Sequence, residues 1–381
     1  MNLLDRHLAR SILGTCIAAV CLFAFVLMAG NIIRDLLGPL LSGQLSVLAF
    51  ARLVLLLIPF VISYALPLGM LTAVLLTLGR LSSDSEITAM RAAGMSIPRI
   101  AVPVLALAAL GVALGLRVNF ESMPRAKIQY EREFAAAVRA NPLSFIVPKT
   151  FIREFPGVVV YVGSKDGPDL RDIWYWQLDG EKRVVRFVHA ESGRVDYDEA
   201  TNEFVIPVSK AHVEDYDRKA PDDFTQPLKV NTFDEVAPVR LSLAQYFGSA
   251  TVHQKLPWMT YGELVAERAR LEALPVPAGG QMQRERDVMK VTLTIQDKIN
   301  MALAIFSFAL IGIPLGIRVS RRETSANLGI AVSLALGYYF LTVMVGWLDR
   351  HPEYRPDLLL WVPNLVFLAL GAWMLRRLDR A

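Results

Sequence analysis

A chain of 381 residues would ordinarily form two or three soluble domains, but 54% hydrophobic residues, 20% charged residues and a mean hydropathy of +0.38 exclude that class. Of the 40 basic and 36 acidic side chains, 24 and 27 lie between Glu121 and Lys298, so the net charge of +4 divides into −3 for this insert and +7 for its flanks. The chain is therefore a membrane protein made of two apolar blocks around a polar insert. Its basic excess belongs to the apolar blocks and gives no argument for a nucleic-acid partner.

Six stretches without a formal charge are long enough to cross a bilayer core as helices, which takes roughly 20 residues. If the N-terminus is inside, the short cytoplasmic segments hold eleven arginines and the outer ones five, so both termini are expected in the cytoplasm. The insert follows the third span and is then periplasmic in a bacterium. The charge-free spans argue against a proton- or ion-coupled secondary transporter. The stretches are 11–33, 53–79, 100–116, 299–317, 324–348 and 358–375.

The insert is predicted to be β-rich between two helical stalks. Residues 125–139 have helical composition and end at Asn141-Pro142, and a second helix is expected over 260–274. Between them, β-branched and aromatic runs alternate with turn signals such as Asp166-Gly167-Pro168 and Ser192-Gly193, as in a sandwich or jellyroll. The runs are 143–147, 150–155, 158–162, 172–178, 183–189, 204–208, 211–216 and 228–233.

Three aromatic residues occupy successive positions of one predicted strand. Trp174 and Trp176 therefore face one side of the sheet and Tyr175 the other. The simplest interpretation buries the two tryptophans in a packed core and leaves Tyr175 on the surface. The alternative is an apolar trough that receives acyl chains or an added β-strand.

The connection between the second and third spans carries the most informative short motif. Ser83 and Glu86 have the spacing of a capping box, and Gly94 is placed to stop a helix, so a short helix is expected at the inner face of the membrane. Such a helix can lie passively in the membrane interface. Alternatively, it docks into a partner protein through Glu86 and Arg91.

Residues 76–94, LTLGRLSSDSEITAMRAAG, resemble the signature of the LptF/LptG permeases of the lipopolysaccharide exporter through the core Ser85-Glu86-Ile87-Thr88-x-Met90-x-Ala92-x-Gly94. The resemblance covers the whole chain, because that family also has three spans, a periplasmic β-domain and three further spans. The segment is slightly closer to LptF than to LptG.

The resemblance implies a permease subunit of an ATP-driven transporter that extracts lipopolysaccharide from the inner membrane. In the family, LptF and LptG pair, an LptB-like cytoplasmic ATPase dimer binds the ATP, and the β-jellyroll passes the lipid to an LptC/LptA-like periplasmic bridge. The chain itself is then expected to need no cofactor. By position, the ATPase contact falls on Ser85, Glu86, Met90, Arg91 and Gly94.

The family usually carries basic residues at the outer end of the first span, where they meet the lipid's phosphates, and Arg34 occupies that place. A guanidinium offers bidentate donors to phosphate, although an arginine that ends a span is often a plain interfacial anchor. Asp35 follows directly and lysine is absent from the first 126 residues, so the basic cluster is thinner than the family pattern. Arg52 and Arg117 are further candidates at outer ends.

The expected fold class is a membrane α-helical protein with six transmembrane helices and an inserted periplasmic all-β jellyroll-like domain. Residues 1–139 would hold three spans and the coupling helix 83–94, residues 140–256 the β-domain, and residues 257–381 a helical stalk and three spans.

Two other classes of function agree less well with the sequence. A membrane-anchored periplasmic assembly or scaffold protein with a partner-binding β-domain would need one span rather than six. An intramembrane enzyme is disfavoured by the charge-free spans. Neither catalytic nor metal-ligating residues are expected, because the sequence has no P-loop, H-E-x-x-H or G-x-S-x-G motif and its five histidines lack metal-ligand spacing.

Overall fold

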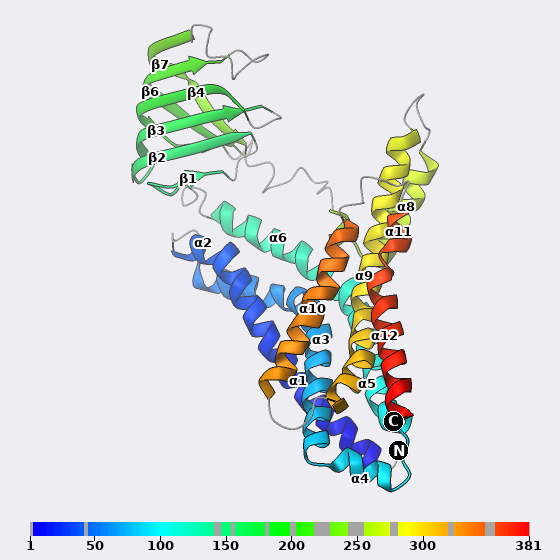
Figure 1. Cartoon of the computed structure of the whole chain (residues 1–381). Helices are drawn as coiled ribbons and strands as arrows, with labels where there is room; N and C mark the ends of the chain where they lie inside the picture. Colours follow the sequence, from blue (N-terminus) through cyan, green and yellow to red (C-terminus); the bar gives the residue numbers. More distant parts are fainter. Residues whose placement is uncertain are drawn as a thin grey trace. The chain divides into compact units, whose positions relative to one another are not determined.

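The computed structural model describes residues 3–41, 45–140, 146–153, 157–179, 183–198, 203–216, 229–242, 255–274, 281–318, 324–346 and 355–380. They form two compact units (Figure 1). The membrane unit comprises Met1–Ile32, Val54–Tyr130 and Gln254–Ala381, and the β unit comprises Ile33–Leu53 and Glu131–His253.

Long apolar runs without charges make the membrane unit helical. Among the described residues, five continuous helical segments are long and apolar enough to cross a membrane, and they coincide with five of the six predicted spans. The sixth predicted span falls on α10, whose apolar stretch is Gly329–Val345, and its last two residues lie outside the described part. The helices are α1 (Leu3–Asn31), α3 (Val47–Ser83), α4 (Glu86–Ala92), α5 (Ile97–Arg117), α6 (Met123–Ala140), α8 (Tyr261–Ala273), α9 (Gln281–Arg318), α10 (Thr324–Gly346), α11 (Pro356–Leu359) and α12 (Val362–Asp379).

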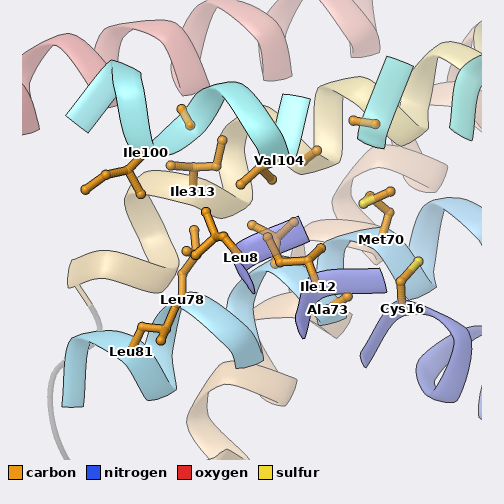
Figure 2. Packing of buried hydrophobic residues seen from close by; sticks show 14 of the residues in the cluster. Leu8, Ile12, Cys16, Met70, Ala73, Leu78, Leu81, Ile100, Val104 and Ile313 are labelled. Carbon is orange, nitrogen blue, oxygen red and sulfur yellow. The ribbon is translucent and has the colours of Figure 1, made fainter. Parts of the chain in front are cut away.

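Helix α9 is the centre of the membrane unit. Its most apolar window is 67% buried, whereas the windows of the other four spans are at most 33% buried. One cluster of buried side chains joins it to α1, α3, α4 and α5, and a second joins it to α3, α10 and α12. Figure 2 shows the first cluster, in which Leu8 and Ile12 of α1 meet Leu78 of α3 and Ile313 of α9.

Both termini lie at the same end of the membrane unit as α4 (Figure 1). An ion pair of 2.8 Å joins the buried Asp5 carboxylate to Arg99 at the start of α5. The backbone N–H of Ile97 donates to Asp379 Oδ1 near the C-terminus over 3.1 Å. These contacts agree with the even number of spans predicted from the sequence.

The β unit contains one antiparallel sheet, which confirms the predicted all-β insert. Its order is β1-β2-β3-β4-β6-β5, with β7 also paired to β6. Apolar side chains, mostly aliphatic, form its core, which includes Val160, Ile173, Val188 and the aromatic Phe204. The strands are β1 (Phe151–Ile152), β2 (Val158–Asp166), β3 (Asp169–Leu178), β4 (Val184–Arg194), β5 (Asp196–Asp198), β6 (Glu203–Asp215) and β7 (Lys229–Ser242), and the π-turn η1 (Ile32–Leu36) and α2 (Leu37–Leu41) also fall in or at the edge of this unit.

Two strand boundaries were wrong. The predicted runs 204–208 and 211–216 form the single strand β6 as far as Asp215, and this strand passes Pro207 by a shift of register against β7. Gly193 lies inside β4 rather than in a turn. A Cβ there would lie 2.7 Å from Ile173 Cδ1 and 3.0 Å from the Pro207 carbonyl oxygen, so this glycine permits a close approach between strands.

The faces of the aromatic strand are opposite to the simplest interpretation. Tyr175 packs against the sheet's core, whereas Trp174 and Trp176 lie on the other face, half-buried, with their ring centroids 6.0 Å apart. The alternation itself was right, but Asp172 adopts the left-handed conformation, with φ of 55°, directly before these residues. At this irregularity the core residues Leu170 and Ile173 are three positions apart, and from Ile173 onward the odd-numbered residues face the core, which leaves Trp174 and Trp176 on the other face.

Asp172 gives the β unit a pH-dependent contribution to stability. The indole Nε1–H of Trp174 donates to its Oδ1 over 2.7 Å, and His189 Nε2 lies 3.0 Å from the same oxygen. These two contacts lower the pKa of the carboxyl below its ordinary 3.8. Because the folded pKa is depressed, the stabilisation is complete above the ordinary pKa and is lost as the pH falls below it.

We therefore expect Asp172→Asn to be less stable than the parent at about pH 5, and this difference in stability to be smaller at about pH 3, since the parent begins to lose the stabilising effect of its carboxylate below its ordinary pKa. Thermal unfolding followed by circular dichroism at both pH values measures this. Asp169→Asn removes the same charge from the same strand but leaves both contacts of Asp172 in place. The difference in stability between this variant and the parent should therefore not narrow in this way. Parallel pH profiles for the parent and Asp172→Asn would contradict the prediction.

Candidate functional site

The predicted capping box at the start of the coupling helix is wrong. Helix α3 continues to Ser83, and α4 begins at Glu86 with Ser85 as its N-cap. Within this described segment Ser85 makes no side-chain capping bond, because its backbone is left-handed, with φ of 60° and ψ of 11°. The reversal between α3 and α4 thus takes only two residues, and this leaves no room for the extended N-cap that a capping box needs.

The predicted stop at Gly94 is confirmed. Its φ is +86°, which glycine adopts without strain. Its N–H donates to the Arg91 carbonyl over 2.9 Å, and the N–H of Met95 donates to the Met90 carbonyl over 3.1 Å. This pair of bonds is a Schellman motif, which satisfies the last carbonyls of α4 and turns the chain into α5.

Helix α4 is attached to the bundle by its apolar side. Ile87 is buried, and Met90 and Met95 pack against the cluster that joins α1, α3, α5 and α9. Ser85, Glu86, Arg91 and Gly94 are exposed. The structure therefore brings the five predicted contact residues together on one short helix and its two ends, with the polar members available to a partner and Met90 forming part of the base.

A cavity of about 510 Å³ lies beside α4. Apolar groups form most of it, and Glu86 is its acidic member. Sequence reasoning missed the contribution of α1, because residues 3–8 look like the lead-in to a membrane span. In the structure Leu4 is 40% exposed, whereas Leu8 is buried. The lining residues are Leu4, His7, Leu8, Leu81, Glu86, Ala89 and Met90.

Each of the three candidate phosphate-binding arginines lies beside a carboxylate. Arg34, in η1, forms a fork with its neighbour Asp35, with N–O distances of 2.8 and 2.9 Å. Arg52 lies 3.8 Å from Glu133. All three guanidinium groups are exposed, so a phosphate can reach them, but it would compete with the carboxylate already present. Arg117, in turn, lies 3.8 Å from Glu121.

The buried Lys298 is a functional candidate that sequence reasoning missed. It is 5% exposed, and its Nζ donates to the carbonyls of Asn119 and Met259 over 2.9 and 3.1 Å. Asn119 donates back from Nδ2 to the Lys298 carbonyl over 2.9 Å and accepts a hydrogen bond from the Ser63 hydroxyl. Asn119 lies in η2 (Val118–Ser122), a π-helical turn between α5 and α6, and such turns are common at functional sites. In the sequence, Lys298 directly precedes the charge-free fourth span, and this position gives no sign that its charge is buried.

No group of three or more His, Cys, Asp or Glu side chains within the described ranges is arranged to hold a metal ion. Helix α4 and the bundle around it are therefore the main candidate site. Over residues 6–377 the chain matches the family model described as lipopolysaccharide export system permease LptF/LptG. The chain belongs to the LptF/LptG family.

Curated relatives carry both names of this family. The lipopolysaccharide export system permease protein LptF of Escherichia coli (strain K12) is 22% identical over 370 residues, which are 96% of this chain and 92% of that protein. LptG of Haemophilus influenzae (strain ATCC 51907 / DSM 11121 / KW20 / Rd) is 24% identical over 201 residues, which are 52% of this chain and 56% of that protein.

Family membership and the apolar helices make this LptF/LptG protein a multi-pass inner-membrane permease of lipopolysaccharide export. It is a non-catalytic transporter subunit, and the family implies a paralogous LptF or LptG partner.

Proposed function

We propose that this LptF/LptG-family permease is driven by a separate LptB-like cytoplasmic ATPase dimer that binds ATP and docks on α4. The observation that carries the proposal is the construction of α4, which combines a buried apolar base, a Schellman end at Gly94 and exposed charges at Glu86 and Arg91. A helix in contact with membrane lipid alone needs no cavity beside its charged side. The cavity next to Glu86 provides space for a side chain of the partner.

Movement of α4 would pass directly into the spans. Ile87 belongs to the same buried cluster as Leu8 of α1, Ile100 of α5 and Ile313 of α9. Packed side chains transmit displacement because the interior has little free volume. Nucleotide-dependent closure of the ATPase would therefore shift α1 and α5 against α9 and narrow the lipid cavity that this chain forms with its paralogue. In this proposal α4 and both termini face the cytoplasm.

The β unit would receive the lipid in the periplasm. Its core face is lined by aliphatic side chains and by the partly buried Tyr175, a surface suited to acyl chains once the sheet opens. From there the lipid would pass to an LptC/LptA-like bridge. Within the pair, we propose that this chain is the LptF subunit, because the LptF relative matches nearly the whole chain.

Arg34, Arg52 and Arg117 are proposed contacts for the phosphates of the lipid. Their exposure supports this role. A phosphate carries more charge and more acceptor oxygens than a carboxylate, so it can displace Asp35 from Arg34.

Reversing the charge at Glu86 tests the proposal. We expect Glu86→Lys to lower copurification of the ATPase, and the ATP hydrolysis coupled to this permease, by at least about tenfold, because a mispaired charge at an interface costs several kcal/mol. Glu272→Lys is the matched control, because it makes the same charge reversal at an exposed residue of α8, outside α4 and its cavity. Purification in a mild detergent followed by quantitative mass spectrometry measures both variants. Equal ATPase recovery with Glu86→Lys and the parent would contradict the docking role of α4.

A further inference from the structure

The face of the β unit opposite its core carries a layer of aromatic rings, which we call the outer aromatic face. The outer face of a sheet that has one buried side is normally polar, and a contiguous apolar patch on it marks an interaction site. Phe151 is 53% exposed and the other rings are half-buried, so part of the layer is accessible. Its members are Phe151 on β1, Tyr161 on β2, Trp174 and Trp176 on β3, and Phe187 on β4.

The rings form one connected layer. Phe187 lies 5.7 Å from Trp174 and 5.5 Å from Trp176, measured between ring centroids. Phe151 lies 5.8 Å from Trp176 and 5.1 Å from Tyr161. Side chains on four neighbouring strands therefore build a single platform, and interdigitation across strands holds each ring in place.

Polar groups border the platform. At one end, Asp172 accepts the Trp174 indole N–H over 2.7 Å, and the His189 imidazole lies against Trp174 at 4.6 Å between centroids. The Asp172 side chain is 53% exposed and its backbone is left-handed, a strained conformation that is concentrated at functional sites. Glu214 on β6 lies directly opposite Phe187 in the ladder and supplies a second carboxylate.

The chemistry of this border selects the ligand. Carboxylates beside the rings repel phosphates and anionic lipid headgroups, and aromatic surfaces that bind such membranes are bordered by basic groups instead. A neutral pyranose fits, because the C–H bonds of its ring face pack on aromatic rings while its hydroxyls donate to carboxylates. Phe151 belongs to the edge strand β1, but Trp174, Trp176 and Phe187 lie on the interior strands β3 and β4, whose backbones are already paired, so these rings do not suit an added β-strand.

We propose that the outer aromatic face binds neutral sugar rings, with Trp174 and Trp176 as the stacking surface and Asp172 as the principal hydrogen-bond acceptor. We assign these sugar rings to the exported lipopolysaccharide. This assignment rests on the proposed export function, whereas the binding site itself rests on the geometry of the outer aromatic face.

The test uses the full chain in a polyoxyethylene detergent, since the headgroup of a sugar-based detergent would compete for the site. The probe is the core oligosaccharide released from lipopolysaccharide by acid hydrolysis and then dephosphorylated, which carries neither acyl chains nor phosphate. Saturation-transfer NMR measures binding and identifies the sugar protons in contact. We expect saturable binding, with the strongest transfer to C–H protons of a ring face.

Trp174→Ala and Trp176→Ala should each weaken binding about tenfold, the loss expected for one stacked ring. Asp172→Asn keeps every ring and should weaken binding several-fold, which guards against a ring variant that fails to fold. Trp373→Ala is the matched control, because Trp373 is 56% exposed on α12 in the membrane unit and should leave binding unchanged.

Absence of saturable binding to the parent chain would overturn the site, and so would binding that survives both ring variants. Binding of the β unit to anionic lipid vesicles through the same rings, without the oligosaccharide, would identify a membrane-facing surface and also overturn it. Failure here is distinct from failure of the export function, because association with the ATPase is measured separately through Glu86.

Discussion

Replacing Gly371 with valine is expected to separate α12 from α9 and to destabilise the membrane unit by about 1–3 kcal/mol or more, the usual cost of forcing extra atoms into a packed interior. A Cβ at position 371 would lie 2.9 Å from the backbone nitrogen of Ile311 and 3.0 Å from the carbonyl carbon of Leu310. Because these are backbone atoms of the central helix, no side-chain rotation can relieve the contact. Helices in membranes depend on such small-residue contacts for close packing.

Thermal unfolding in detergent measures the effect at Gly371, and the yield of folded protein provides a second readout. Gly337→Val is the matched control on α10. In the described part of the chain, no atom would lie within 4 Å of a Cβ at Gly337. Similar losses of stability in both variants would show that valine is poorly tolerated in these helices generally and would remove the packing explanation.

Lys298→Met is expected to loosen the junction where the chain returns to the membrane unit. Methionine keeps the length of the side chain but removes its donors, so the carbonyls of Asn119 and Met259 lose their bonds to Nζ. Each unsatisfied buried acceptor costs about 1–3 kcal/mol. We expect faster hydrogen exchange in η4 (Leu256–Trp258) and in the first turn of α8, together with a lower unfolding temperature.

Lys290→Met controls for the loss of a lysine from α9. Lys290 is half-exposed and pairs only with Asp287 among the contacts described for it, at 3.3 Å, so its loss should change stability by less than about 0.5 kcal/mol. Equal exchange rates near Met259 in the two variants would show that Lys298 does not hold the returning segment.

Hydrophobic length predicted most of the fold. A membrane span must satisfy its backbone internally over some 20 residues, so an uninterrupted apolar run is a strong signal, and α9 and α12 lie where the runs placed them. The β-rich insert was visible for a similar reason, because its alternating strands contrast with these runs.

Local conformation was harder to predict. The direction in which Trp174 points depends on the left-handed backbone of Asp172, which a side-chain alternation does not reveal. The capping box failed because α3 extends to Ser83 and occupies the position that the cap required. The cavity beside Glu86 also depends on α1, which is distant in sequence, so only tertiary packing could place Leu4 and His7 there.

Lys298 holds two segments that are far apart in the sequence at a common point of the membrane unit. The outgoing chain passes through Asn119 in η2 before α6, and the returning chain passes through Met259 before α8. With both segments bonded to one side chain of α9, a displacement of that helix would move η2 and the residues just before α8 together.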